Sequence, residues 1–376
     1  MKKFKSGEYQ QQDGYKSFNP APINRQWAIE NPEILELLGH ADRELGRLDM
    51  FSEYVPDIDL FIYLHTVKEA TQSSKIEGTQ TNAEEIFIDN INLNPEQRLD
   101  KMEVQNYIRA IHEGVSQLSS LPISTRLIKK IHFILMQGVR GKNKTHGEYR
   151  ISQNWIGGAT LKDAVFIPPH HLGMNTLMGD FEKFLHNQDV YIPHLIKIAI
   201  AHYQFETIHP FLDGNGRIGR LIIPLYFMEK GLIKRPILYL SDYFEKHRQL
   251  YYDHLNNIRV KSDLTAWLKF FLVGIIETAK NGIGTFDAIL KLQKSLDKKF
   301  AAFGKRSVHV KKLIDHLYEN PVINSTKTIS LLKVSKPTAI KLLTDLETAG
   351  ILVETTGYSR NRFYLFQDYM RCFFND

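Results

Sequence analysis

The chain has 376 residues with a formal net charge of +6, and 43% of its residues are hydrophobic while 24% are charged. This length allows two or three domains, and this composition excludes a disordered or collagen-like chain. The single cysteine, Cys372, excludes an internal disulfide, and no run is apolar enough for a membrane span or a secretory signal, so we expect a cytoplasmic protein without a membrane partner.

Residues 1 to about 50 are expected to form an extended, irregular segment, because prolines interrupt the pattern there. From Ile58 to Ile76 apolar residues recur at helical spacing, and the stretch Ser-Ser-Lys-Ile-Glu-Gly closes this helix. Ser73 and Glu77 are four residues apart, so they share one face, and Gly78 is of a type that ends helices. Taken alone, this stretch is best interpreted as an ordinary helix end.

A strong helical pattern runs from Lys101 to Leu118. Between Gly147 and Pro169 two short runs of strand-forming residues predict a β-hairpin, whose second arm carries Val165 and Phe166. A helix that is apolar on most sides then begins at Pro193, so we expect it to be buried. His202 on this helix is interpreted as a core histidine with satisfied hydrogen bonds.

The segment from His209 to Arg220 reads His-Pro-Phe-Leu-Asp-Gly-Asn-Gly-Arg-Ile-Gly-Arg, and an apolar helical run follows it. Gly214 and Gly216 lack Cβ atoms, so backbone amides at the start of that helix can approach an anion such as phosphate. Arg217 and Arg220 are three residues apart on one helix face, where two guanidinium groups can hold a polyphosphate.

Two further side chains in this segment are suited to phosphate chemistry. Asp213 is suited to Mg²⁺, which needs only one or two protein carboxylates when phosphates supply the other oxygens. His209 can accept a proton from an attacking hydroxyl near neutral pH. A lone Gly-Asn-Gly turn or a basic pair is more often structural, and it is the combination that is specific.

Farther on, aromatic residues are frequent between Tyr239 and Leu255, where core packing is an alternative to nucleotide contact for Tyr239 and Tyr251. Two helices are then predicted, from Leu264 to Lys280 and from Gly284 to Phe300.

The last segment, 304–376, predicts three helices and a β-hairpin, which together make a winged helix. Ser335 would cap its recognition helix, on which Lys336, Thr338 and Lys341 could face DNA. The segment is only weakly basic, so contact with protein or packing in a homodimer is as well supported as DNA binding.

The segment from His209 to Arg220 matches without departure the Fic family signature H-x-F-x-[D/E]-G-N-G-R-x-x-R. The chain therefore resembles Fic proteins, which implies protein adenylylation (AMPylation), the transfer of AMP from ATP to a serine, threonine or tyrosine hydroxyl of a target protein or of the enzyme itself. The resemblance implies His209 as the base, Asp213 as the Mg²⁺ ligand and Phe211 as a core anchor of the loop. It implies a nucleotide-binding set of Asp213, Gly214, Asn215, Gly216, Arg217, Arg220, Tyr252, Val165 and Phe166.

The stretch from Ser73 to Gly78 is similar to the [S/T]-x-x-x-E-[G/N] inhibitory motif of many Fic proteins. Its place before the signature implies the class whose inhibitory helix precedes the Fic core. Glu77 would then pair with Arg220 and occupy the guanidinium that should receive the γ-phosphate. In this family the hairpin is a flap that aligns the target as an added strand, although a hairpin that only packs is an alternative.

We therefore expect a mainly α fold, with a Fic helical bundle, a short β-hairpin flap and a C-terminal winged helix. The expected domains are an N-terminal segment with the inhibitory helix (1–100), a Fic catalytic core (101–260), a helical extension (261–303) and a winged-helix domain (304–376). The functional alternative is a DNA-binding regulator whose Fic core senses a nucleotide without transferring it.

Overall fold

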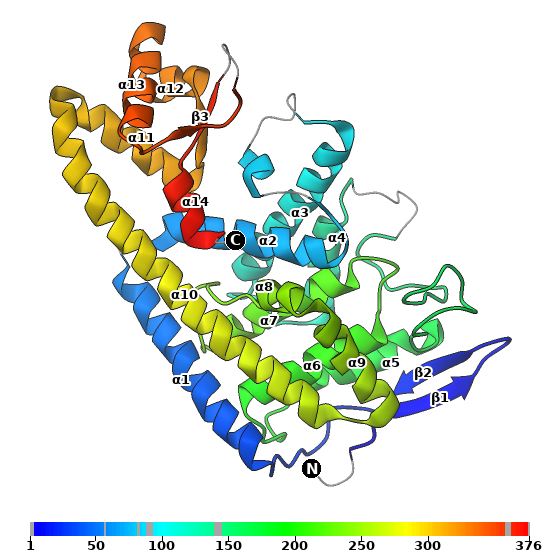
Figure 1. The fold of residues 1–376 in the computed structure, drawn as a ribbon. Helices are drawn as coiled ribbons and strands as arrows, with labels where there is room; N and C mark the ends of the chain where they lie inside the picture. The colour runs from blue at the N-terminus through cyan, green and yellow to red at the C-terminus, as the bar shows by residue number, and fades with distance from the viewer. Residues whose placement is uncertain are drawn as a thin grey trace.

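The computed structural model of the protein describes residues 4–55, 58–80, 83–87, 93–138, 145–357 and 362–374. It is mainly helical, as predicted, with small strands only at its periphery (Figure 1). Within these ranges, no helix combines the length and the hydropathy that crossing a bilayer requires.

Two consecutive helices form the centre of the molecule. Helix α6 (His194–Ile208) is buried at every position after its first, and it begins one residue later than predicted, because Pro193 is its N-cap. Helix α7 (Asn215–Glu229) is also largely buried, even though Pro224 lies inside it. The helices packed around this pair are α2 (Ile58–Ile76), α3 (Pro95–Gln117), α4 (Thr125–Leu135) and α5 (Met174–His186).

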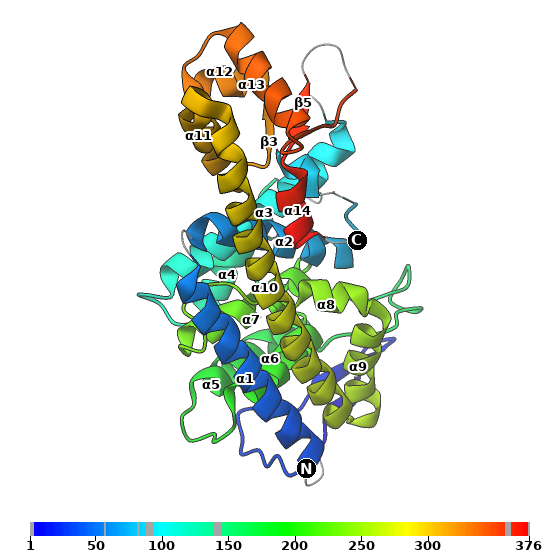
Figure 2. The same cartoon turned by 60° about the vertical axis from the view of Figure 1, so that its left-hand side comes forward.

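Two long helices, α1 (Pro32–Tyr54) and α10 (Leu264–Phe300), lie side by side along one flank (Figures 1 and 2). The prediction that residues 1 to about 50 are irregular is wrong, because Asn31 caps α1 through the amides of Glu33 and Ile34. The two helices predicted between Leu264 and Phe300 are one continuous helix, which packs against α1 and α6.

The N-terminal strands β1 (Gly7–Gln11) and β2 (Lys16–Pro20) form an antiparallel hairpin that the sequence did not predict. The hairpin predicted between Gly147 and Pro169 is reduced to a single bridge, between Ile156 and Phe166. Positive φ angles at the two glycines after Ile156 turn the chain away at once, so no regular strand follows.

Shorter elements connect these helices. The chain passes from α7 to α10 through two helices, α8 (Ser241–Lys246) and α9 (Arg248–Lys261). In the part of the chain that the structure describes, 3₁₀ turns lie at Ala83–Phe87, His171–Gly173 and Ala301–Arg306.

The C-terminal segment contains the three predicted helices and a three-stranded antiparallel sheet in the order β3-β5-β4. Ser335 caps α13 through the amide of Thr338, as predicted. The tip of the predicted hairpin, residues 358–361, lies outside the described residues, and the winged-helix identity stays a prediction. The elements are α11 (Ser307–Glu319), β3 (Val322–Asn324), α12 (Ser325–Leu332), α13 (Lys336–Thr348), β4 (Val353–Glu354), β5 (Phe363–Leu365) and an unpredicted α14 (Gln367–Phe373).

Candidate functional site

The loop between α6 and α7 carries the predicted site. His209 follows the last residue of α6 in the left-handed conformation, with φ of 51°, and Gly214 is left-handed directly before α7. Asn215 closes the loop, because its Oδ1 accepts from the Phe211 amide and its Nδ2 donates to the Phe211 carbonyl, both at 2.8 Å. The side chain of Asn215 therefore stabilises the loop in this structure, and its contact with phosphate stays a prediction.

Phe211 is fully buried and anchors the loop, as the resemblance implied. Its ring stacks on His132 of α4, with the ring centroids 3.7 Å apart and the planes 7° from parallel. His132 accepts from the Gly147 amide at Nδ1 and contacts the Asp213 carbonyl through Nε2. Burial lowers the pKa of His132 to about 4, so it is neutral and its proton lies on Nε2.

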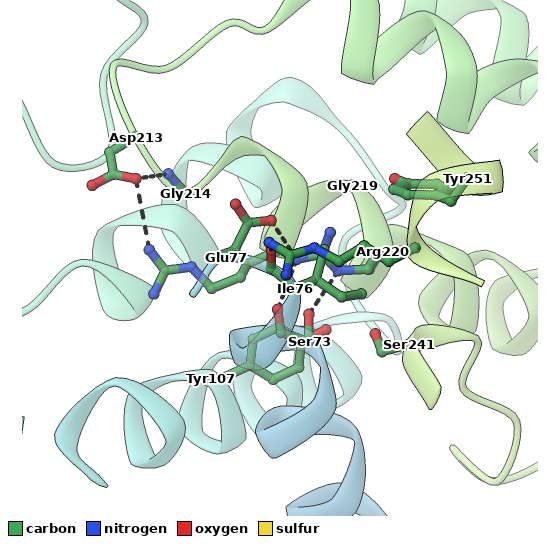
Figure 3. Close-up of polar contacts among 12 residues, drawn as sticks. Ser73, Ile76, Glu77, Tyr107, Asp213, Gly214, Gly219, Arg220, Ser241 and Tyr251 are labelled. Atoms are coloured by element: carbon green, nitrogen blue, oxygen red, sulfur yellow. Dashed lines mark hydrogen bonds and ion pairs between the residues drawn. The ribbon is translucent and has the colours of Figure 1, made fainter. Parts of the chain in front are cut away.

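Arg220 is held by the end of α2. Its Nε donates to the Ser73 hydroxyl at 2.8 Å, and one terminal nitrogen donates to the Ser73 carbonyl at 2.9 Å and to Glu77 Oε1 at 2.6 Å (Figure 3). Desolvation alone would raise the pKa of Glu77, but the Arg220 guanidinium holds that pKa below its ordinary value. Ser73 and Glu77 thus use one helix face, as predicted, and both contact the same arginine.

Gly216 makes room for this carboxylate. A Cβ atom at Gly216 would collide with Oε1 of Glu77 and would lie 2.9 Å from a terminal nitrogen of Arg220. The Glu77 carboxylate therefore lies against the first turn of α7, where the sequence predicted a bound anion.

Arg217 lies in a different environment from Arg220. Its guanidinium is buried, with one terminal nitrogen 3.1 Å from Oε2 of Glu103 on α3 and the other 3.8 Å from Oδ1 of Asp213. The same Asp213 oxygen accepts from the Gly214 amide at 2.7 Å (Figure 3). The two arginines thus hold their carboxylate partners at two separate points around the start of α7.

Asp213 is the candidate Mg²⁺ ligand, and its side chain is partly open to solvent. Among the described ranges, no group of three or more His, Cys, Asp or Glu side chains could hold a metal by itself. Asp213 fits a Mg²⁺ site in which the protein supplies one carboxylate and the phosphates of a nucleotide supply the other ligands.

His209 lies among cations that the sequence did not identify as part of the site. Burial, followed by the charges of Arg150 and Arg259, lowers its pKa to about 4. The imidazole is therefore neutral at physiological pH, which is the form that accepts a proton.

The remaining predicted site residues, Tyr252, Val165 and Phe166, differ in their exposure to solvent. Tyr252 is 40% exposed, whereas its neighbour Tyr251 is buried and donates to His202. Val165 is 73% exposed, and Phe166 is buried, with its ring 3.9 Å from the Arg259 guanidinium carbon. His202 also contacts the Gly219 carbonyl, which confirms the interpretation of a satisfied core histidine.

Four contacts at the site come from residues to which the sequence analysis gave no role at the site. They come from α3, α4, the first arm of the predicted flap and α9, far from the signature along the chain, and no spacing rule connects them to it. They are Glu103, His132, Arg150 and Arg259.

Comparison with known proteins identifies the family. The profile described as Fic/DOC family N-terminal matches residues 35–116, and the Fic/DOC family profile matches residues 122–227. Two curated relatives named protein adenylyltransferase Fic, from Aedes aegypti and Culex quinquefasciatus, are 34% and 33% identical to this chain over 125 residues. These residues are 33% of this chain and only 22% of each relative's length.

Solved structures share the fold. A Fic family protein from Desulfovibrio desulfuricans matches 91% of this chain and 98% of its own, with a TM-score of 0.58 and 20% identity. A Fic domain containing signaling protein from Bacteroides thetaiotaomicron matches 67% of this chain and 97% of its own, with a TM-score of 0.53 and 15% identity. By its two profile matches, its signature loop and its fold, the chain belongs to the Fic/DOC family.

Proposed function

We propose that this chain transfers AMP from ATP to a hydroxyl group of a protein. The observation that carries the proposal is the neutral His209 at the end of α6, four residues before an Asp-Gly-Asn-Gly turn that opens α7. The acceptor oxygen attacks the α-phosphorus, its proton passes to His209, and pyrophosphate leaves. The names of the curated relatives agree with this reaction.

The proposed nucleotide contacts follow from the geometry of the loop. The amides at the start of α7, around Gly214 and Gly216, receive phosphate oxygens, and Arg217 and Arg220 neutralise their charge. Bound Mg²⁺ would be held by Asp213 and by nucleotide phosphates, and would offset charge on the phosphates and on the leaving group. The exposed Tyr252 ring is available to stack on adenine.

We further propose that Glu77 keeps the enzyme slow. Its carboxylate occupies the guanidinium of Arg220 and the space above Gly216, which are the two features that the γ-phosphate of ATP would use. A nucleotide that binds while Glu77 remains in place must put its phosphates elsewhere, so the α-phosphorus is not aligned with the acceptor.

The target is proposed to be a protein segment that lies along the flap beside the exposed Val165. Contacts of the C-terminal segment with DNA, with protein or with a second copy remain proposals as well. On α13, Lys336, Thr338 and Lys341 are exposed, as such contacts require.

The test is incorporation of labelled AMP from ATP and Mg²⁺ by the parent protein and by Glu77→Gly. Glu77→Gly is expected to label itself or an added lysate faster than the parent, and adding His209→Ala is expected to abolish labelling. Glu53→Gly is the matched control, because Glu53 is an exposed carboxylate that pairs with Lys234 away from the site.

An unchanged or lower rate in Glu77→Gly would refute inhibition by Glu77. Labelling that survives His209→Ala would refute the mechanism. If no variant transfers AMP but ATP still binds, the alternative of a nucleotide-sensing regulator is favoured.

A further inference from the structure

The last turn of α6, which leads into His209, is held at its carbonyl groups by two buried arginines. Arg150 comes from the first arm of the predicted flap and is 1% exposed, and Arg259 comes from α9 and is 8% exposed. The final carbonyls of a helix have no partners within it and carry the negative end of its dipole. Two guanidinium groups at this point therefore satisfy acceptors and balance charge together.

Arg150 fixes the backbone on both sides of the base. Its Nε donates to the His209 carbonyl at 2.9 Å, and one terminal nitrogen donates to the carbonyls of Ile208 and Pro169. The other terminal nitrogen donates to the Ser152 carbonyl, and the Arg150 amide donates to the Pro210 carbonyl at 2.9 Å. One side chain thus connects the left-handed residue His209 to both arms of the predicted flap.

Arg259 holds the preceding turn. Its Nε donates to the Thr207 hydroxyl and a terminal nitrogen donates to the Glu206 carbonyl, both at 3.2 Å. The guanidinium also lies over the Phe166 ring, with its carbon 3.9 Å from the ring centroid. The flap and the helix that carries the base are therefore joined by each arginine independently.

The charges that face His209 come from four elements. Burial and the cations Arg150 and Arg259 act against its protonation, while Glu77 of the α2 end and the Glu206 carbonyl of α6 act in favour of it. Burial lowers the pKa of Arg150 only to about 10, so this guanidinium remains charged at neutral pH. Burial and the two cations together outweigh Glu77 and the Glu206 carbonyl, so the imidazole stays neutral and can accept a proton.

We propose that Arg150 and Arg259 are positioning residues that hold the end of α6 and the left-handed His209 in place and keep two cations beside this base. This inference rests on the proposed function, in which His209 is the base. Neither arginine touches the reacting atoms, and each acts through His209 and its backbone.

The test uses full-length protein in the Glu77→Gly background, with Arg150→Gln, Arg259→Gln and Arg150→Lys. The pKa of His209 is read from ¹³C-histidine NMR and its signal is identified with His209→Gln. Each glutamine variant is expected to raise this pKa by about one unit, because one nearby cation is lost. The acid limb of the kcat/KM profile for AMP transfer is expected to move upward by the same amount.

Arg150→Lys separates charge from geometry. Lysine keeps the positive charge, so the pKa of His209 is expected to stay low. A single ammonium group cannot donate to the carbonyls of residues 152, 169, 208 and 209 as the guanidinium does, so kcat is expected to fall. Arg98→Gln is the matched control, because Arg98 donates to the Leu93 carbonyl away from the site. If Arg150→Gln does not fold, the pKa of His209 in Arg259→Gln tests the proposal.

The proposal is overturned if His209 titrates in the glutamine variants as in the parent, or if Arg98→Gln shifts it equally. If the pKa of His209 shifts in the glutamine variants but no variant transfers AMP, Glu77→Gly included, the effect of the arginines on His209 is supported. The proposed function is refuted in that case.

Discussion

Ser73 and Ser74 are neighbours near the end of α2, but their hydroxyl groups have different environments. The Ser73 hydroxyl accepts a hydrogen bond from Arg220 at 2.8 Å, whereas the buried Ser74 hydroxyl has no hydrogen-bond partner among the described residues. Hydrogen bonds to charged groups contribute about 1.5–3 kcal/mol, so the Ser73 hydroxyl contributes substantially to holding the Arg220 side chain in place. Ser73 and Glu77 therefore both hold this arginine through their side chains.

Ser73→Ala is expected to release Arg220 in part and to raise the rate of AMP incorporation by about tenfold, which corresponds to about 1.4 kcal/mol. The rise should be smaller than that of Glu77→Gly, because the carboxylate and the carbonyl of residue 73 remain. Ser74→Ala is the matched control and should leave the rate unchanged. Equal rates for the two alanine variants would show that the Ser73 hydroxyl does not contribute.

The buried His202 makes the stability of the fold depend on pH. Burial lowers its folded pKa to about 3, whereas an unfolded histidine has a pKa of about 6.5. Below pH 6.5 the unfolded chain therefore binds a proton that the folded chain does not. As the pH decreases, His202 alone lowers the free energy of unfolding by about 1.4 kcal/mol per pH unit. The raised pKa of Glu206, about 7, acts in the opposite direction.

His202→Gln removes the contribution of one histidine and leaves that of Glu206 in place. Between pH 7 and pH 5, its free energy of unfolding is expected to fall less than that of the parent, by about 2 kcal/mol. Urea titrations at pH 7, 6 and 5 measure this difference. Parallel pH dependences in the two proteins would contradict the assignment of a neutral His202.

At the scale of elements, the sequence predicted what depends on local pattern. Helix α2 begins and ends where its apolar spacing indicated, and Ser335 caps α13 as its residue type suggested. The family resemblance of the signature loop implied Phe211 as a core anchor, and the side chain is fully buried. Contacts made by Arg150 and Arg259 were not predictable, because packing of distant segments brings them to His209.

Helix α10 shows how packing overrides local pattern. The sequence suggested a break between Lys280 and Gly284, but the helix continues through Gly282, which lies against α1. A Cβ atom at Gly282 would lie 3.0 Å from a Leu48 methyl carbon, whereas one at Gly284 would meet nothing within 4 Å. The first glycine therefore serves the contact between helices, and the second only weakens the helix.

Gly284→Ala is expected to raise the free energy of unfolding by about 0.5–1 kcal/mol, because alanine favours the helix and loses less entropy on folding. Gly282→Ala should gain less or destabilise the protein, because Leu48 must move. Denaturant unfolding of both variants measures the difference. An equal gain at Gly282 would show that α1 and α10 do not need their close approach there.

At the scale of the whole molecule, α2 connects the candidate site to the C-terminal segment (Figure 1). Near its start, the fully buried Phe61 packs against Tyr318 of α11 and Tyr369 of α14, with ring centroids 5.5 and 6.2 Å away. Near its end, Ser73 contacts Arg220. A rigid helix is thus fixed at one end by the C-terminal segment and at the other by the arginine of the site.

Phe61→Ala is expected to cost about 3–5 kcal/mol of stability, because it leaves a cavity between α2 and the C-terminal segment. It should also raise the rate of AMP incorporation, since a loosened α2 holds Ser73 and Glu77 less firmly on Arg220. Phe184→Ala is the matched control, because Phe184 is equally buried but lies on α5, against Trp27. Thermal unfolding measures the loss of stability, and labelling is measured at a temperature where both variants are folded. Similar losses of stability with faster labelling only in Phe61→Ala would support a connection between the C-terminal segment and Arg220 through α2. Equal labelling rates in the two variants would refute it.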